Sequence, residues 1–360
     1  MKKGLSLLSI VLILVAFVLG FALRPLVAPT AAGPEGAAGE TFQWTLQMHG
    51  TSAHPVFPLY QQWAADIKEM SGGRLQITIH PVGTVVPLLE SLGAVTQGTL
   101  DGAIMWGPFW RGQDPVLPLS CGQTAGLTSA EMQTWLHNYG GLELIQEAYG
   151  RHNIHWLPAI PIPSEIFLWA HRPVRTVADL RGLKLRAAGY SLDVFTALGA
   201  AATFMPGGET PPALMKKTID AGEFGSLVQD MAMGFHEAAR YAMVGPRAPV
   251  INDDLLINAD RWKELPPDLQ NIVKTSTLRH ASTGYGHLLR LDQEAMQRAN
   301  QHGTVFVSVS DELALAFRST LDGILDGEAA GNANLAKIWQ AQLAFRTDFR
   351  TFKGTLFAWE

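Results

Sequence analysis

Segments with strand periodicity and segments with helical periodicity alternate along this chain, and that order limits the folds it can adopt. Residues 42–48 alternate apolar and polar side chains, as a half-buried strand does, and residues 74–81 repeat the pattern. Apolar residues at helical spacing lie between them, over residues 56–70. Further strands are expected at residues 102–106, 165–170, 183–186, 202–205 and 219–221. The order predicts an α/β fold with parallel sheets, helices on both faces, and ligands at the carboxyl ends of the strands.

Two other stretches have a helical pattern. Residues 129–149 predict one long amphipathic helix, and the chain from residue 266 onward is mostly helical in pattern. The tail carries an apolar face made of Leu313, Leu315, Phe317, Leu321, Ile324 and Leu325. Such a face needs a partner, which is either the protein's own lobes or a second subunit.

Composition and charge exclude two classes of protein. The chain is 47% hydrophobic and 16% charged, which excludes a disordered chain. The formal net charge is -5, which argues against a surface that binds nucleic acid. A length of 360 residues indicates two lobes or one large domain.

The N-terminal segment has the pattern of an export signal. A basic start at residues 1–3 precedes an uncharged apolar run over residues 5–23. Small residues at positions 30–32 offer a cleavage site, and residues 33–41 resemble a linker. Residues 1–32 are therefore either a signal peptide or a retained N-terminal membrane anchor, and both alternatives place the body of the protein outside the cytoplasm.

Catalytic motifs are largely missing. His236 and Glu237 begin like H-E-x-x-H, but Arg240 stands where the second zinc ligand belongs. The only cysteine, Cys121, excludes an intramolecular disulfide and is expected to be a small buried residue. His49 and His54 follow the first expected strand and are either cleft-lining or ordinary loop histidines.

Several local sequences, in this order and spacing, resemble the extracytoplasmic solute-binding proteins of TRAP transporters. They span most of residues 42–300. They are Ser-Gly-Gly-Arg-Leu at 71–75 with His-Pro-Val-Gly at 80–83, Gln-Gly-Thr-Leu-Asp at 97–101, Val-Ala-Asp-Leu-Arg-Gly-Leu-Lys-Leu-Arg at 177–186, Met-Pro-Gly-Gly-Glu at 205–209, Thr-Ile-Asp-Ala-Gly-Glu at 218–223 and Trp-Lys-Glu-Leu-Pro at 262–266. The helix over 129–149 and the Pro-Gly-Gly-Glu loop are most similar to the branch that binds 2-oxo acids and lactate with a metal ion.

The resemblance implies a two-lobed periplasmic-binding-protein-like fold with crossover segments, a long hinge helix and a helical C-terminal tail. Lobe I is expected at residues 42–160, with about 247–300 returning to it, and lobe II at 161–246. Residues 301–360 are expected to form C-terminal helices through which members of this branch dimerise. The expected partners are a small organic acid, the TRAP membrane permease subunits and, as one alternative, a second copy of the chain.

Arg186 is the residue that the resemblance assigns to the ligand carboxylate. It matches the arginine of the family's Leu-Lys-x-Arg sequence and ends the strand expected at 183–186. A guanidinium presents paired donors that fit a carboxylate, so the residue type suits that role. The alternative is a surface cation or an ion pair within one lobe.

Three residues are predicted to hold a metal ion. The branch carries a Glu-Trp pair whose carboxylate and backbone carbonyl contact the metal, and here the pair is Glu223 and Phe224. The branch also carries a glutamine at the position of Glu165. Two carboxylates plus carbonyls are a hard oxygen set that suits calcium.

A sum of charges supports calcium in this set. Glu165, Glu223, Arg186 and a monocarboxylate together carry two negative charges, which one divalent cation neutralises. Sodium, or no metal, is the alternative. Glu165 is then protonated, or it binds a cationic or hydroxyl-rich substrate.

Trp106 and Phe109, with Trp110, follow an expected strand end and are predicted to pack over the ligand or in the core. The predicted function is capture of a small 2-oxo or 2-hydroxy acid by lobe closure, without catalysis. One alternative is a metal-dependent enzyme that uses Glu165 and Glu223. Another is a sensory binding protein that signals to a receptor.

Overall fold

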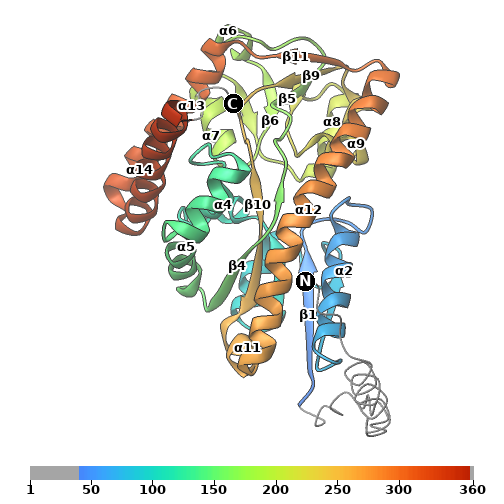
Figure 1. Ribbon diagram of the computed structural model, residues 1–360. Coiled ribbons are helices and arrows are strands. Elements are labelled where there is room, and N and C mark those ends of the chain that lie inside the picture. The colour runs from blue at the N-terminus through green and yellow to red at the C-terminus, as the bar shows by residue number, and fades with distance from the viewer. Residues whose placement is uncertain (1–39, 357–360) are drawn as a thin grey trace, which may run out of the picture. The chain divides into compact units, whose positions relative to one another are not determined.

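The computed structural model describes residues 40–356. Two β-sheets with helices packed around them make up this part of the chain (Figure 1). The expected signal peptide or anchor at 1–32, and all but the last two residues of the expected linker, lie outside the described residues. Over the range that is described, no helix combines the length and apolar character that a membrane crossing requires.

The first sheet has five strands in the order β2-β1-β3-β10-β4. Strand β1 is parallel to β2 and β3, whereas β10 is antiparallel to β3 and β4. The bounds are β1 Phe42–Met48, β2 Leu75–His80, β3 Gly102–Met105, β4 Ile154–Ile162 and β10 Ile251–Asn258. Trp44, Leu46 and Met48 of β1 are buried, as the alternating pattern predicts.

The second sheet has six strands in the order β11-β9-β5-β8-β6-β7. Strand β5 is antiparallel to β8 and β9, and the other pairs are parallel. The bounds are β5 Leu168–Ala170, β6 Lys184–Arg186, β7 Ala201–Thr203, β8 Ala221–Gly222, β9 Tyr241–Val244 and β11 Val305–Ser308.

Both sheets are mixed, so the prediction of purely parallel sheets is wrong. Strand β4 leads from the first sheet to the second, and β10 returns and pairs with it along most of its length. Two crossing segments that run in opposite directions pair antiparallel when they lie side by side. Periodicity reports which face of a strand is buried but not the direction of its neighbour.

Helices cover the sheets. The four short 3₁₀ helices are Leu88–Glu90, Gly107–Trp110, Leu117–Cys121 and Gly207–Glu209. The α-helices are α2 Phe57–Met70, α3 Ser91–Thr96, α4 Ser129–Asn138, α5 Gly141–Gly150, α6 Val177–Leu180, α7 Tyr190–Ala197, α8 Thr210–Met215, α9 Leu227–Ala232, α10 Phe235–Ala238, α11 Ala259–Glu264, α12 Pro267–His302, α13 Asp311–Gly331 and α14 Ala333–Leu356.

Helix α12 runs for 36 residues and packs against elements of both sheets (Figure 1). In its first third, Thr277 Oγ1 accepts a 3.1 Å hydrogen bond from Trp63 Nε1 of α2, beside the first sheet. Further along, Asp292 Oδ1 accepts a 2.7 Å bond from the backbone N–H of Val228 in α9, beside the second sheet. The long helix that the resemblance implies is therefore present and is attached to both halves.

The helix predicted over residues 129–149 is broken in two. Helix α4 ends at Asn138 and α5 begins at Gly141, because Gly140 adopts a left-handed conformation with φ of 78°. Helix α4 begins with Thr128 as its N-cap, and the side chain of Glu131 completes a capping box. The apolar spacing continues through the break, which is why periodicity alone missed it.

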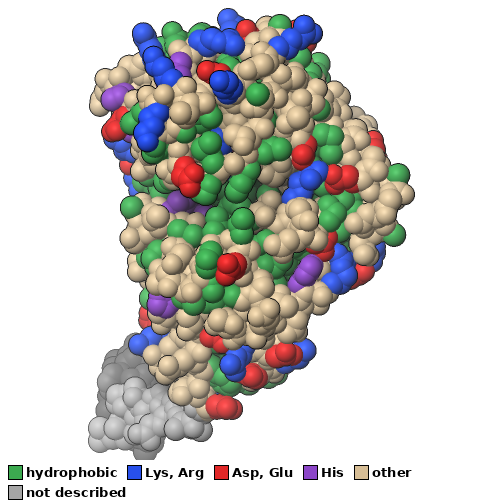
Figure 2. Space-filling view, turned by 180° about the vertical axis from the view of Figure 1, so that it is seen from behind, with side chains coloured by type: hydrophobic (Ala, Val, Ile, Leu, Met, Phe, Trp, Pro, Cys, Tyr) green, Lys and Arg blue, Asp and Glu red, His purple; other side chains and the backbone are tan. Residues whose placement is uncertain are grey.

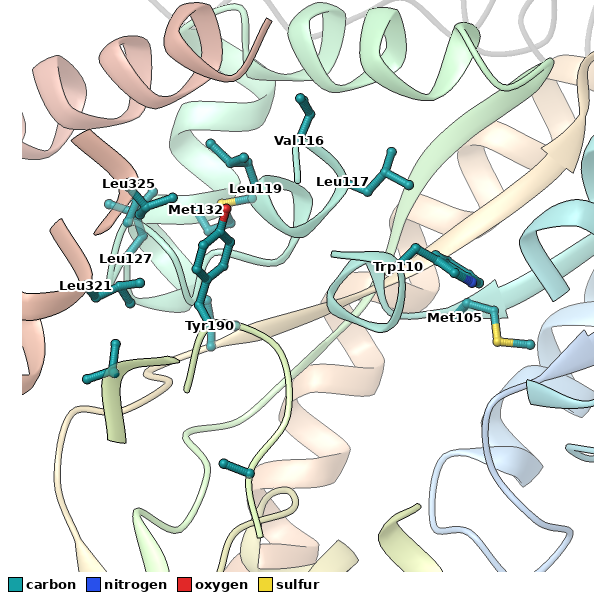
Figure 3. Close-up of a cluster of buried hydrophobic side chains, with 14 of the residues drawn as sticks. Met105, Trp110, Val116, Leu117, Leu119, Leu127, Met132, Tyr190, Leu321 and Leu325 are labelled. Atoms are coloured by element: carbon teal, nitrogen blue, oxygen red, sulfur yellow. The ribbon is translucent and has the colours of Figure 1, made fainter. Parts of the chain in front are cut away.

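Helices α13 and α14 pack against the protein's own chain. Figure 3 shows Leu321 and Leu325 of α13 beside Leu127, within the same buried cluster as Tyr190 of α7. Leu313 and Phe317 are buried in that cluster too, whereas Leu315 is 70% exposed. Most of the apolar face of the tail is thus covered by the chain itself.

Candidate functional site

Arg186 lies at the end of β6 and is only 3% exposed. Its Nε donates a 3.1 Å hydrogen bond to the carbonyl of Met205, and its Nη1 donates to the carbonyl of Glu223. Nη1 also lies 3.4 Å from Oε1 of Glu223. Among the described residues, Nη2 has no hydrogen-bond partner. The guanidinium is fixed by backbone carbonyls and keeps one nitrogen for another acceptor.

Glu223 is placed beside Arg186 by the pairing of β6 with β8, in which Arg186 faces Gly222. The backbone N–H of Glu223 donates to the carbonyl of Arg186 over 3.2 Å. Its Oε1 accepts a 2.7 Å bond from the N–H of Ala188. The parallel pairing of these two strand ends therefore places Glu223 in contact with Arg186.

Glu165 precedes β5 and is 2% exposed. Its N–H bonds to the carbonyl of Ala248, and its carboxylate oxygens accept no hydrogen bond from the described residues. Oε2 forms an ion pair of 2.6 Å with Nη2 of Arg247. Burial raises the pKa of Glu165 to about 7, even though Arg247 favours the charged form.

Arg247 is a site residue that the sequence analysis missed. It is 2% exposed, and its guanidinium joins the two acids: Nη2 reaches Glu165, and Nη1 lies 3.2 Å from Oε2 of Glu223. One signal in the sequence could have indicated Arg247. It follows shortly after β9, which ends at Val244, and ligand-binding residues lie at strand ends in sheets of this kind.

Arg247 corrects the sum of charges from which calcium was predicted. The charges of Glu165, Glu223, Arg186 and Arg247 sum to zero. A bound monocarboxylate therefore brings the total charge of the site to −1, whereas the sum without Arg247 gave −2.

Asp230 is a second residue that the sequence analysis missed. It accepts hydrogen bonds from Trp169 Nε1 at 2.6 Å and from the N–H of Gly225 at 2.8 Å. Burial raises the pKa of Asp230 well above its usual value, which favours the neutral acid.

Aromatic rings form the opposite wall. The ring centroids of Trp106 and Phe224 are 6.3 Å apart, and Phe109 stacks on Trp106 at 5.5 Å. The guanidinium carbon of Arg186 lies 5.9 Å from the centre of the Phe224 ring. The structure brings Trp106, Phe109 and Phe224 together, whereas Trp110 is fully buried in the core.

His49 and His54 lie at this wall and are both buried. His49 Nε2 is 3.2 Å from Oδ1 of Asp253, and its ring lies 4.7 Å from Trp106. His54 Nε2 is 3.4 Å from Nε2 of Gln229. Burial, followed by the nearby His49, lowers the pKa of His54 to about 3. Both side chains therefore belong to the interior beside the site, not to an exposed loop.

The segment between β3 and α4 contacts helix α7, which lies beside the second sheet. Gln123 Nε2 donates a 2.7 Å bond to Ser191 Oγ, and Tyr190 OH donates to the carbonyl of Pro115 at 3.2 Å. Hydrophobic side chains extend across the middle of the face in Figure 2, and Lys and Arg side chains gather at the end that carries the second sheet. The arrangement encloses the buried charges between two contacting walls.

Comparisons with known proteins agree on one family. The family model described as bacterial extracellular solute-binding protein, family 7, matches residues 47–330. The chain is similar to the monocarboxylate 2-oxoacid-binding periplasmic protein of Nostoc sp., with 31% identity over 297 residues, 82% of this chain and 80% of the relative.

Two solved TRAP periplasmic solute-binding proteins have the same two-lobed fold. The protein from Colwellia psychrerythraea, with bound calcium and pyruvate, is 25% identical with a TM-score of 0.84, over 88% of this chain and 98% of that one. The protein from Pseudoalteromonas atlantica, with bound sodium and pyruvate, is 26% identical with a TM-score of 0.83, over 88% and 97%. The predicted fold class and the family resemblance are confirmed. The chain belongs to bacterial extracellular solute-binding protein family 7 and is a binding protein of the TRAP type, not an enzyme.

Proposed function

We propose that this protein captures a small 2-oxo or 2-hydroxy monocarboxylate between its two lobes and delivers it to TRAP permease subunits. The observation that carries the proposal is Arg186, whose Nη2 is left without a partner among the described residues while its other nitrogens are held by carbonyls. The pyruvate bound by two structural neighbours, and the name of the Nostoc relative, support a small 2-oxo acid.

The surroundings of Arg186 suit a small anion. The guanidinium is almost entirely buried, and a charge-assisted hydrogen bond is stronger where water is excluded. Phe224 and Trp106 lie beside it, so the apolar end of a short acid would meet aromatic rings. The close approach of these two rings favours a ligand of few carbon atoms.

Lobe closure is the proposed mechanism of capture. Lobe I is proposed to comprise 42–160 with about 247–300, and lobe II 161–246, in line with the sheets to which their strands belong. A ligand that contacts both walls binds the closed form more tightly and so increases its population. The permease would then recognise the closed form outside the cytoplasm, after export by the segment at 1–32.

The side chains as arranged do not fit the predicted calcium ion. Arg247 lies between Glu165 and Glu223 and occupies oxygens that the ion would need. Across residues 40–356 no three His, Cys, Asp or Glu side chains are grouped to hold a metal. Calcium takes about six to eight oxygen ligands. The proposed capture therefore rests on Arg186, although Oε1 of Glu165 has neither a hydrogen bond nor an ion pair with any described residue.

A homodimer through the C-terminal helices stays a proposal. Most of the apolar face of α13 is buried against the same chain, and exposed Leu315 is what remains for a second copy. A hollow lined by Tyr139, Phe345 and Phe349 along α14 offers further apolar surface.

Arg186→Ala tests the proposed carboxylate anchor. We expect pyruvate or lactate to raise the melting temperature of the unmodified protein, because a ligand that binds only the folded state stabilises it. The variant should lose this shift and weaken binding by at least about 100-fold, since a buried charged pair is worth several kcal/mol. The measurement is a thermal-shift screen followed by calorimetric titration.

Arg181→Ala is the matched control, because Arg181 is exposed on the same lobe. It should leave both the shift and the affinity unchanged. A screen in which no small carboxylate shifts the melting temperature would contradict the proposed function, as would an Arg186→Ala variant that binds normally.

A further inference from the structure

Arg247 is placed at the site by the backbone around it. The N–H of Glu165 bonds to the carbonyl of Ala248 over 3.0 Å, and Nη2 of Arg247 donates to the carbonyl of Ile166 over 3.0 Å. The main-chain bond places residue 165 beside residues 247–248 independently of the charge on either side chain, and the bond from the guanidinium to the Ile166 carbonyl adds to it. An acid at position 165 thus has a cation at position 247 beside it.

The terminal nitrogens of Arg247 are both in use within the protein. Nη2 forms an ion pair with Glu165 at 2.6 Å and donates a hydrogen bond to the Ile166 carbonyl. Nη1 forms an ion pair with Glu223 at 3.2 Å and donates a hydrogen bond to Ser191 Oγ at 3.4 Å. Arg247 thus differs from Arg186, which keeps one terminal nitrogen free. Its guanidinium binds the two acids to each other and is not the anchor of the ligand.

We propose that Arg247 supplies the positive charge between Glu165 and Glu223, so that carboxylate binding by this protein does not depend on a bound metal cation. The inference rests on the proposed function, since it concerns the same site. Two buried carboxylates need positive charge or hydrogen bonds close to them, and the guanidinium provides the charge. Its two terminal nitrogens lie 2.6 Å from an oxygen of Glu165 and 3.2 Å from an oxygen of Glu223, so the guanidinium bridges the two carboxylates.

Calorimetric titration with pyruvate in three buffers tests the inference on the full exported chain. The buffers contain choline chloride with a chelator, sodium chloride, or calcium chloride. We expect the dissociation constant of the unmodified protein to agree within about threefold across the three. A larger loss of affinity without sodium and calcium overturns the inference, whatever the variants do.

Arg247→Gln should convert the site to one that needs a cation. Without the guanidinium, Glu165 and Glu223 repel each other, and we expect affinity for pyruvate to fall by roughly tenfold or more in choline and to recover in calcium. Arg247→Lys keeps the charge and should keep binding independent of calcium. Arg240→Gln, the same kind of change at an exposed arginine, is the control and should behave like the unmodified protein. An Arg247→Gln variant with no greater response to calcium overturns the inference.

A second readout needs no organic ligand. Calcium alone, added to the ligand-free proteins, should raise the melting temperature of Arg247→Gln but not that of the unmodified protein. If no small monocarboxylate binds in any buffer, the proposed function fails, and this calcium titration still decides the role of Arg247. A calcium-dependent shift in the unmodified protein would count against the inference even where pyruvate binds.

Discussion

Single residues in this protein hold buried carboxyl groups in place through hydrogen bonds, and Asp254 is the clearest case. Its carboxylate accepts bonds from Trp156 Nε1 at 2.6 Å, the N–H of Gly107 at 2.8 Å, Ser120 Oγ at 2.9 Å and Tyr149 OH at 3.0 Å. Burial nevertheless raises the pKa of Asp254 to about 7. Asp254 in β10 is thereby hydrogen-bonded to four surrounding segments, one of which is the turn that follows Trp106.

Asp254→Asn should change how stability depends on pH. The folded pKa of about 7 lies above the ordinary value of 3.8, so the folded state keeps a proton that the unfolded state has lost. The stability from this group is complete below about pH 4 and is lost as the pH rises through 7. The free energy of unfolding of the unmodified protein should therefore fall relative to the variant, by up to about 1.4 kcal/mol per pH unit.

Urea unfolding of both proteins between pH 4.5 and pH 8 measures this difference. The variant has an amide that does not titrate, so any fixed cost of the substitution is the same at every pH. A difference that stays constant over the range would show that Asp254 does not titrate there.

The two arginines show what the sequence could and could not predict at this scale. Arg186 ends a short strand with a recognisable pattern, and the chemistry of a guanidinium suits a carboxylate, so its place was predictable. Arg247 lies 82 positions after Glu165 in a loop without periodicity. The main-chain bond between Glu165 and Ala248 brings the two segments together, and no property of either side chain encodes that bond.

At the scale of elements, the turn between α4 and α5 depends on one backbone conformation. Gly140 has a φ of 78°, and a Cβ added there would have no atom within 4 Å. The cost of a side chain at this position is therefore conformational and not steric.

Gly140→Ala should lower the free energy of unfolding by about 1 kcal/mol, because alanine rarely adopts this conformation. Gly150→Ala is the matched control, since Gly150 is the last residue of α5 and its φ is not in the left-handed region. That control should be neutral or slightly stabilising, because alanine loses less conformational entropy than glycine. Thermal unfolding of both variants measures the effect, and equal losses would contradict it.

Elements with strong periodicity were predictable, and elements shaped by distant partners were not. Residues 42–48 form β1 as expected. The strand expected from residue 165 begins only at Leu168, because the N–H groups of Glu165 and Ile166 bond to carbonyls in two loops. The same bonds that shorten the strand place Glu165 at the site.

At the scale of the whole molecule, we expect the contacts between the proposed lobes to set the balance between the proposed open and closed forms. The bond from Gln123 to Ser191 joins residues 68 positions apart, one from each proposed lobe. It is buried and does not belong to the proposed ligand anchor. Because Ser191 Oγ also accepts a 3.4 Å bond from Arg247, the change is made at Gln123, which leaves that second bond in place.

Gln123→Met keeps the size of the side chain and removes its donor. We expect affinity for pyruvate to fall by about two- to tenfold, because the lost bond stabilises the closed form by about 0.5–1.5 kcal/mol. Small-angle scattering should show that more pyruvate is needed to compact the variant. Gln62→Met on the exposed face of α2 is the control and should change neither result. Unchanged affinity in Gln123→Met would show that this contact does not contribute to closure.

Helix α12 carries Gly284 and Gly286 between its bond to α2 at Thr277 and its bond to α9 at Asp292. Glycine makes a helix interior easier to deform. Helix α12 is held on either side of these two glycines. If its two ends turn toward each other, we expect it to bend at the glycines. We therefore expect the stiffness of the helix at these two positions to contribute to the energy of the proposed lobe closure, although neither residue belongs to the proposed ligand anchor.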